Sequence, residues 1–242
     1  MLVKACLNGG RAKHEHPAVP ISHPELALDA YQAVAAGAGG VHVHPRQADG
    51  SETVEAGACA LALTAIRRVV PGTPVGLTTA AWIEPDPDRR RWAVARWEVL
   101  PDFASVNVSE EGWGDLAATL LDLGVGVEAG LASVEDAEAL ARSGLAGRCL
   151  RVLVEVPQED PAEAVAAAAR IEAALDDAGI EAPRLHHGEG PATWAVVEAA
   201  VLRGRDVRVG LEDTLVLQDG RPARDNAELV RAGVRVAGRG RA

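Results

Sequence analysis

Two histidines separated by one residue, His42 and His44, end a short apolar segment that begins at Gly40. Alternate residues of a β-strand point to the same face, so this spacing can direct both imidazoles towards one point. Imidazole nitrogen is a common zinc ligand, but a metal site needs at least a third ligand. The pair alone therefore leaves two interpretations open: a metal site, or two ordinary polar side chains packed under a loop.

A candidate third ligand is Glu212, which follows the apolar segment Val207–Gly210 and precedes Asp213. In a closed barrel of eight strands, only the first strand separates the eighth from the second. Neighbouring strands lie about 4.8 Å apart, so a carboxylate and an imidazole can converge on one ion across about 10 Å. Such a ligand set leaves coordination positions open for water or a chelating substrate, as in catalytic zinc sites. The alternative is an acidic pair that favours a helix N-terminus.

Arg208 lies within the same apolar segment, four residues before Glu212. A buried guanidinium is costly unless it pairs with an acid such as Asp213 or binds an anionic substrate. The alternative is a solvent-facing residue at the start of the strand, because Arg205 and Asp206 directly precede it.

Short β-rich segments alternate with longer, alanine-rich amphipathic segments, which is the pattern of βα units around a parallel sheet. About eight such units in 242 residues predict a (β/α)8 barrel with a last helix near Asn226–Ala232. No linker-like segment interrupts the pattern, so we predict a single domain over residues 1–242. An open, doubly wound sheet is the alternative, because parallel strands look alike in both folds. The predicted strands are Leu2–Leu7, Gly40–His44, Val75–Thr79, Phe103–Val108, Val125–Glu128, Leu150–Val156, Arg184–His186 and Val207–Gly210.

Composition excludes several classes of protein. The net charge of −11, from 35 acidic and 24 basic residues, argues against a nucleic-acid or anionic-membrane partner. Three widely spaced cysteines without a Cys-x-x-Cys pattern make a disulfide framework or a thiolate zinc site improbable. No export signal and no long uncharged apolar segment is recognised, so we expect a cytoplasmic protein.

Polar residues follow most of the predicted strands, at the end of the barrel where active sites of this fold are built. Each of them alone is more often a loop or capping residue than a catalytic one. These residues are Asn8 and Arg11, Thr78 and Thr79, Asn107 and Ser109, Glu128, Glu155, and the segment His186–Gly190.

Several blocks of the sequence, in this order and separation, resemble the β-keto acid cleavage enzymes, the family that includes 3-keto-5-aminohexanoate cleavage enzyme. The resemblance covers nearly the whole chain, and the His-x-His and Arg-x-Gly-x-Glu-Asp blocks are its most specific parts. The blocks are Lys4–Gly9, His14–Pro17 with Pro20, Val41–Arg46, Asp49–Gly50, Arg208–Asp213 and Asp225–Val230.

The resemblance implies a zinc-dependent (β/α)8 enzyme that joins a β-keto acid to acetyl-CoA and releases acetoacetate and a new acyl-CoA. The zinc ligands of the family fall on His42, His44 and Glu212. The residues implied to activate or bind the substrate are Arg208 and Asp213, a hydroxyl at Thr78, and a polar pair at Ser105 and Asn107. We add Asn8, Arg11, Glu128 and His186 as expected substrate contacts, and we expect a homo-oligomer, a dimer or a tetramer, as in the family.

Two departures limit what the resemblance implies about the substrate. The better-known, longer members carry a Glu in the loop after the first strand, where this chain has Gly10 and Arg11. Arg11 suits an anionic group instead of an amine. The loop after the sixth strand, Pro157–Asp160, also lacks the glycine-rich extension of the longer members.

The sequence is compatible with three hypotheses about function. The leading one is a β-keto acid:acetyl-CoA acyltransferase. The second is another metal-dependent barrel enzyme, a hydrolase or aldolase that does not use CoA. The third is a barrel without activity that binds a small anion or serves as a subunit, and an intact His42, His44 and Glu212 set argues against it.

Overall fold

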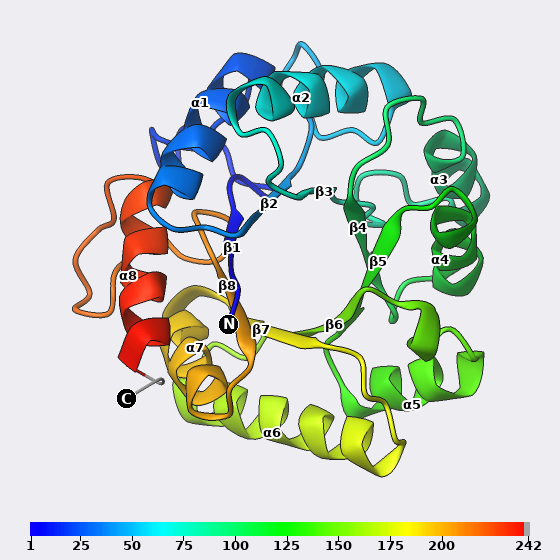
Figure 1. Cartoon of the computed structure of the whole chain (residues 1–242), viewed down its shortest axis with the longest axis vertical. Coiled ribbons are helices and arrows are strands. Elements are labelled where there is room, and N and C mark those ends of the chain that lie inside the picture. Colours follow the sequence, from blue (N-terminus) through cyan, green and yellow to red (C-terminus); the bar gives the residue numbers. More distant parts are fainter. Residues whose placement is uncertain (240–242) are drawn as a thin grey trace.

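The computed structural model describes residues 1–239 and shows a closed barrel of eight parallel strands surrounded by helices (Figure 1). The strands follow one another around the barrel in sequence order, and β1 pairs with β8 to close it. The predicted (β/α)8 barrel is confirmed, and the open doubly wound sheet is wrong. The strands are β1 (Val3–Cys6), β2 (Gly40–Val43), β3 (Val75–Leu77), β4 (Phe103–Asn107), β5 (Gly126–Leu131), β6 (Arg151–Val156), β7 (Arg184–Gly188) and β8 (Asp206–Val209).

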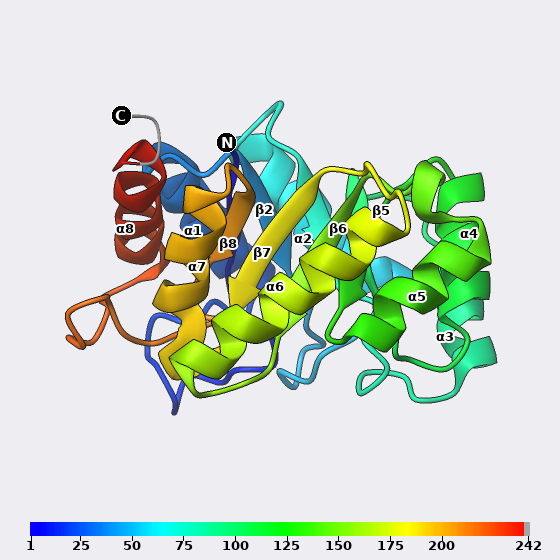
Figure 2. The same cartoon turned by 90° about the horizontal axis from the view of Figure 1, so that it is seen from below.

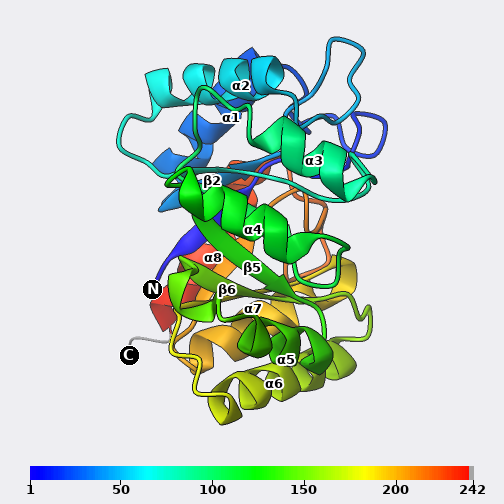
Figure 3. The ribbon, with the colours of Figure 1, turned by 90° about the vertical axis from the view of Figure 1, so that its right-hand side faces the viewer.

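Helices follow the strands and cover the outside of the barrel, as a side view shows for α4 and α5 beside β5 and β6 (Figure 3). The helices are α1 (His23–Ala35), α2 (Ala56–Val69), α3 (Pro87–Val94), α4 (Trp113–Asp122), α5 (Val134–Ser143), α6 (Pro161–Asp177), α7 (Thr193–Leu202) and α8 (Asn226–Arg239). Within residues 1–239, none of these helices combines the length and apolarity needed to cross a membrane.

Local sequence signals fix where helices begin. The Glu25 carboxylate accepts a hydrogen bond from the Ser22 backbone at the start of α1. At the start of α6, the Asp160 side chain accepts bonds from the backbone N–H groups of Ala162 and Glu163. These contacts satisfy N–H groups that the first helical turn leaves without partners.

The N-terminal end of the barrel interior is closed by a cluster of large side chains. Phe103 fills it from β4, and the Nζ atom of Lys4 lies 5.4 Å above the Phe103 ring. Gly76 makes this possible, because a Cβ atom there would lie 1.9 Å from the Phe103 ring. Lys4 also forms a salt bridge with Glu128, which reaches across the barrel from β5. We call Lys4, Phe103 and Glu128 the barrel floor.

The opposite end of the barrel is open and carries the long loops. Figure 2 shows the loops after β1, β2 and β8 gathered at this end, with the N-terminus at the other end. Substrates of barrel enzymes bind at the carboxyl ends of the strands, so this end is where a site is expected.

Candidate metal centre and active site

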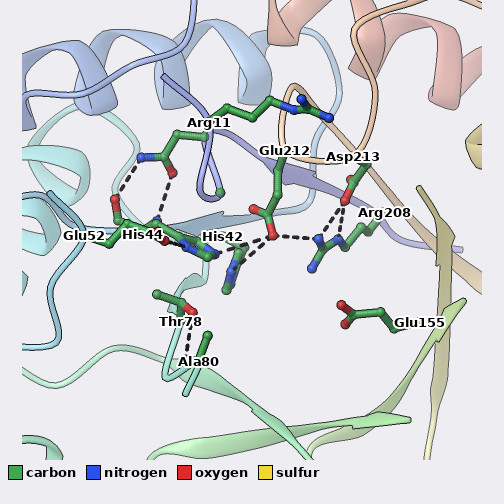
Figure 4. Close-up of polar contacts among 12 residues, drawn as sticks. Arg11, His42, His44, Glu52, Thr78, Ala80, Glu155, Arg208, Glu212 and Asp213 are labelled. Atoms are coloured by element: carbon green, nitrogen blue, oxygen red, sulfur yellow. Dashed lines mark hydrogen bonds and ion pairs between the residues drawn. The ribbon is translucent and has the colours of Figure 1, made fainter. Parts of the chain in front are cut away.

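His42 and His44 meet Glu212 at the open end of the barrel (Figure 4). One ligand atom from each residue lies within 4.8 Å of the others. The Nε2 atoms of His42 and His44 lie 3.9 Å and 3.5 Å from Oε1 of Glu212. Ligand atoms about 2.0–2.1 Å from one tetrahedral zinc ion are roughly 3.4 Å apart, so the three side chains are arranged closely enough to hold a metal.

Glu212 reaches the histidines because the backbone beside it is glycine. Gly9, in the loop after β1, has a φ of +51°, and a Cβ atom there would lie 2.4 Å from Cγ of Glu212. The Glu212 N–H also donates to the Cys6 carbonyl at 3.3 Å. Glu212 lies in a turn after β8 and the next helix begins only at Asn226, so the alternative of a helix N-terminal acid pair is wrong.

Two residues orient His44. Oε1 of Glu52 lies 2.5 Å from Nδ1 of His44, which leaves Nε2 to face Glu212. The side chain of Asn8 forms two hydrogen bonds with the His44 backbone: it accepts one from the His44 N–H at 2.9 Å and donates one to the His44 carbonyl at 2.8 Å. Asn8 is fully buried and its amide is occupied by backbone groups, so it supports a ligand and does not face the substrate. Sequence reasoning missed Glu52, which lies in the irregular loop after β2.

The electrostatics of the ligands suit a cation. Burial lowers the pKa of His42 well below its usual value, so its imidazole is neutral at neutral pH. Burial would raise the pKa of Glu212, but Arg208 and the two histidines outweigh it and hold that pKa well below its usual range. Burial also acts to lower the pKa of His44, yet Glu212 and Glu52 raise it overall. The carboxylate is therefore ionised, as a metal ligand must be.

The donor set fits a divalent metal such as zinc. Two imidazole nitrogens and one carboxylate are the ligands of several catalytic zinc sites. Oε2 of Glu212 is buried and has no hydrogen-bond partner among residues 1–239. A buried carboxylate oxygen without a partner is costly, and a bound cation would satisfy it.

Arg208 and Asp213 form a buried ion pair beside the metal ligands (Figure 4). Nε and Nη2 of Arg208 lie 3.0 Å and 2.6 Å from Oδ1 of Asp213, and Nη2 also lies 2.6 Å from Oε1 of Glu212. Arg208 is only 4% exposed, so the alternative of a solvent-facing strand-start residue is wrong.

Strand register places three further candidates on the inner face of the barrel. His42 is paired with Gly76, and residues two apart share a face, so Thr78 points inward just beyond β3. Gly76 is paired with Phe103, so Ser105 and Asn107 point inward on β4 by the same rule. Thr78 is buried and its hydroxyl accepts from the Ala80 N–H at 3.2 Å. Asn107 donates to Glu110 at 3.0 Å. Thr78 remains a predicted catalytic residue, and Ser105 and Asn107 remain predicted substrate contacts.

Glu128 does not belong to the open end of the barrel. The predicted fifth strand ended at Glu128, but β5 continues to Leu131, so Glu128 lies early in the strand. It is fully buried in the barrel floor, paired with Lys4 and with Arg151 at 3.2 Å. The prediction of a substrate contact at Glu128 is therefore wrong.

His186 faces outward, away from the site. Its Nε2 atom lies 2.7 Å from Oε1 of Glu172 on α6, between the barrel wall and the helix layer. The prediction that His186 contacts substrate is therefore wrong. Neighbouring residues of a strand point to opposite faces, so the residue next to His186 faces the barrel interior. The next residue, His187, points inward, and so does Glu155, with which it is paired in register. Figure 4 shows Glu155 facing the space beside Arg208.

Arg11 lies at the edge of the open end. Its Nη1 atom is 3.0 Å from Oε1 of Glu15 in the same loop, and its side chain is 27% exposed. An anionic substrate group would have to compete with Glu15 for this guanidinium, and the substrate contact at Arg11 stays a prediction.

Three solved structures illustrate how widely this fold recurs. The apo structure of ObcA has a TM-score of 0.74 at 19% identity and matches 93% of this chain, which spans only 62% of ObcA. The 3-hexulose-6-phosphate synthase of Salmonella typhimurium has a TM-score of 0.63 at 15% identity over 99% of this chain and 100% of that one. The 3-dehydroquinate dehydratase of Aquifex aeolicus VF5 has a TM-score of 0.59 at 14% identity over 99% of this chain and 98% of that one. At such identities these similarities concern the fold alone.

Sequence comparison is more specific. The 3-keto-5-aminohexanoate cleavage enzyme of Fusobacterium nucleatum is 25% identical over 264 residues, which cover 98% of this chain and 91% of the relative. The family model described as beta-keto acid cleavage enzyme matches residues 1–241. The barrel brings the His-x-His and Glu-Asp blocks of the sequence together. The match over nearly the whole chain shows that the protein belongs to the beta-keto acid cleavage enzyme family.

Proposed function

We propose that this protein is a zinc-dependent enzyme that converts a β-keto acid and acetyl-CoA into acetoacetate and a new acyl-CoA. The observation that carries the proposal is the His42, His44 and Glu212 cluster beside the Arg208–Asp213 pair at the open end of the barrel. Overall, the acyl group of the β-keto acid passes to CoA while the acetyl group takes its place, so the two reactants and the two products contain the same atoms.

The residues of this chain divide the chemistry between them. A zinc ion held by His42, His44 and Glu212 would supply Lewis-acid stabilisation to the oxygens of a chelated β-keto acid. Asp213 is the base, because its carboxylate lies next to the ligands and can exchange a proton with the substrate. Arg208 keeps a positive charge beside the negative charge that develops on the substrate.

The ligands bound in two structures of similar fold support the choice of substrates. ObcA has been solved as a binary complex with oxaloacetate and as a ternary complex with a C4-CoA adduct and oxalate. Oxaloacetate is itself a β-keto acid, so a β-keto acid and CoA are reasonable partners for this chain also.

A panel of β-keto acids tests the reaction. Purified protein with zinc and acetyl-CoA should form acetoacetate from at least one of them, detected by mass spectrometry together with the new acyl-CoA. The matched control is the His42→Ala protein, which should form neither product. A metal-loaded protein that is inert towards every pair would contradict the proposal.

The second candidate, an aldolase or hydrolase that uses the same metal site without CoA, is tested by the same panel with acetyl-CoA left out. Cleavage at an undiminished rate would favour this candidate. An absolute requirement for acetyl-CoA would support the acyltransferase.

We also propose that the enzyme is a cytoplasmic homo-oligomer. Exposed apolar side chains on the neighbouring helices α1 and α2 support an interface, since such groups on adjacent elements mark contact surfaces. They are Leu28, Tyr31 and Leu61, each more than half exposed. Light scattering coupled to size exclusion should give a dimer or a tetramer, and a monomer at micromolar concentration would contradict this part of the proposal.

A further inference from the structure

The two carboxylate oxygens of Asp213 have different surroundings. Oδ1 accepts hydrogen bonds from Nε and Nη2 of Arg208 at 3.0 Å and 2.6 Å, and Nδ1 of His187 lies 3.4 Å from it. Oδ2 is buried and has no hydrogen-bond partner among residues 1–239. Oδ1 is therefore hydrogen-bonded to Arg208 and lies within ion-pair distance of His187, whereas Oδ2 has no partner among these residues.

His187 connects Asp213 to a second carboxylate. It is fully buried on the inner face of β7, and its Nε2 atom lies 3.3 Å from Oε2 of Glu155 on β6. The Glu155 side chain is 24% exposed, whereas that of Asp213 is 1% exposed. The imidazole thus lies between a buried carboxylate and one that reaches the open end of the barrel.

The loop that carries Asp213 is also attached to the end of β7. The Gly190 N–H donates to the Asp213 carbonyl at 2.8 Å. The Thr193 hydroxyl donates to the Gly188 carbonyl at 3.0 Å and lies 3.4 Å from the Asp213 carbonyl. The Asp213 backbone is therefore hydrogen-bonded to residues that directly follow β7, and this keeps its side chain close to His187 on that strand.

The charges around His187 favour its protonated form. Burial and Arg208 act to lower the pKa of His187, but Glu155 and Asp213 outweigh them and raise it to about 9. Burial would raise the pKa of Glu155, yet His187 and Arg208 lower it to about 2. Glu189, which directly follows β7, and Glu212 also lie close enough to affect these groups. At neutral pH an imidazolium therefore lies between two carboxylates.

Arg208 alone is a poor anchor for a base. Its Nη2 atom is shared between Oδ1 of Asp213 and Oε1 of Glu212, each at 2.6 Å. Any movement of Arg208 towards a bound anion or towards the metal ligand would disturb Asp213. His187 contacts Asp213 and none of the three metal ligands at salt-bridge distance, so it gives the carboxylate a separate attachment.

We propose that His187 and Glu155 are positioning residues, which hold Oδ1 of Asp213 so that Oδ2 is the atom that exchanges a proton with the substrate. The proposal rests on the proposed function, since it takes Asp213 as the base. Glu155 holds the imidazolium in place from the solvent side, and His187 holds Asp213 when Arg208 shifts. The proton passes from the substrate to Oδ2 and returns from Oδ2 to the product, with His187 remaining charged.

Kinetics of His187→Gln and Glu155→Gln test the role in activity. Both variants should lower kcat on the order of 10- to 100-fold, because a displaced base loses its alignment with the substrate. KM and zinc content should stay within about twofold, because neither residue binds metal or substrate. The matched control is His186→Gln, which breaks an imidazole–carboxylate pair on the outer face of the same strand. It should leave kcat nearly unchanged. Equal losses of kcat in the inner and outer variants would overturn the proposal.

A spectroscopic measurement tests the same pairing without any substrate. In long-range ¹H–¹⁵N spectra of histidine-labelled protein, assigned with His187→Gln, the His187 ring should carry protons on both nitrogens at pH 7.5. Glu155→Gln should shift its titration to lower pH. A neutral His187 ring in the wild-type protein would overturn the inference whatever the activity. A charged ring in a protein that is inert towards all β-keto acids would instead contradict the proposed function, so the two failures are distinguishable.

Discussion

The Nδ1 atom of His44 lies 2.5 Å from Oε1 of Glu52, while Nε2 of the same ring lies 3.5 Å from Oε1 of Glu212. The carboxylate of Glu52 therefore fixes the tautomer of His44, with hydrogen on Nδ1 and the lone pair of Nε2 directed at the metal site. Partners of this kind orient a ligand and increase its basicity.

Removal of Glu52 should weaken metal binding. We expect Glu52→Ala to reduce zinc affinity about 10- to 100-fold, as is typical when the partner of a ligating histidine is lost. Glu52→Gln should reduce it less, because the amide oxygen can still accept from Nδ1. Competition with a chromophoric chelator measures both. Glu55→Ala, an exposed residue in the same region, is the control and should bind zinc normally.

Trp82 should report on metal binding. Its ring stacks on His44 with centroids 6.2 Å apart, and its indole N–H donates to Glu52 at 3.1 Å. Zinc binding changes the charge on the His44 ring, so it should change the tryptophan emission of the protein. Trp82→Phe should lose most of this response. Trp92→Phe, which removes another exposed tryptophan, should keep it, and a response lost equally in both would contradict the assignment.

Much of this site could be predicted from the sequence, since it depends on local patterns. Alternation of apolar and polar residues sets the direction of His42 and His44 along one strand. An adjacent pair of acids, Glu212 and Asp213, follows the last strand by a few residues, so few other residues could supply the third ligand. The closed barrel brings the two ends together, and the number of repeated units predicted that closure.

The rest depends on where each strand ends and which face each residue takes. The fifth strand was predicted three residues too short, because Ala129-Gly130-Leu131 lacks the β-branched residues that mark a strand. Two adjacent histidines gave no sign of which one faces inward, so His186 was chosen where the inner residue is His187. Glu52 lies in an irregular loop, and no periodicity predicts a contact there.

The barrel floor should respond unequally to loss of its two charges. Glu128→Leu leaves the buried Lys4 and the partly buried Arg151 without an acid, so we expect a loss of about 3–5 kcal/mol in the free energy of unfolding. Lys4→Met leaves the Glu128–Arg151 pair intact and should cost less. Urea unfolding of both variants measures the difference. A larger loss in Lys4→Met would contradict this account of the floor.

Stability should fall with rising pH because of Asp29. Burial raises the pKa of Asp29 to about 7, despite the hydrogen bond that Asn226 donates to it. The folded protein then binds more protons than the unfolded chain between roughly pH 4 and 7, so the free energy of unfolding decreases across this window, by at most about 1.4 kcal/mol per pH unit. Asp29→Asn should flatten the slope. Asp219→Asn, in an exposed loop, should retain it, and an unchanged slope in Asp29→Asn would contradict the assignment.

The central claim is that His42, His44 and Glu212 hold a catalytic metal ion, and metal analysis of the purified protein tests it most directly. The wild-type protein and an exposed-histidine control, His14→Ala, should each carry about one zinc ion per chain after dialysis. The folded His42→Ala protein, verified by circular dichroism, should carry little or none. Equal metal content in wild-type and His42→Ala proteins would contradict the account.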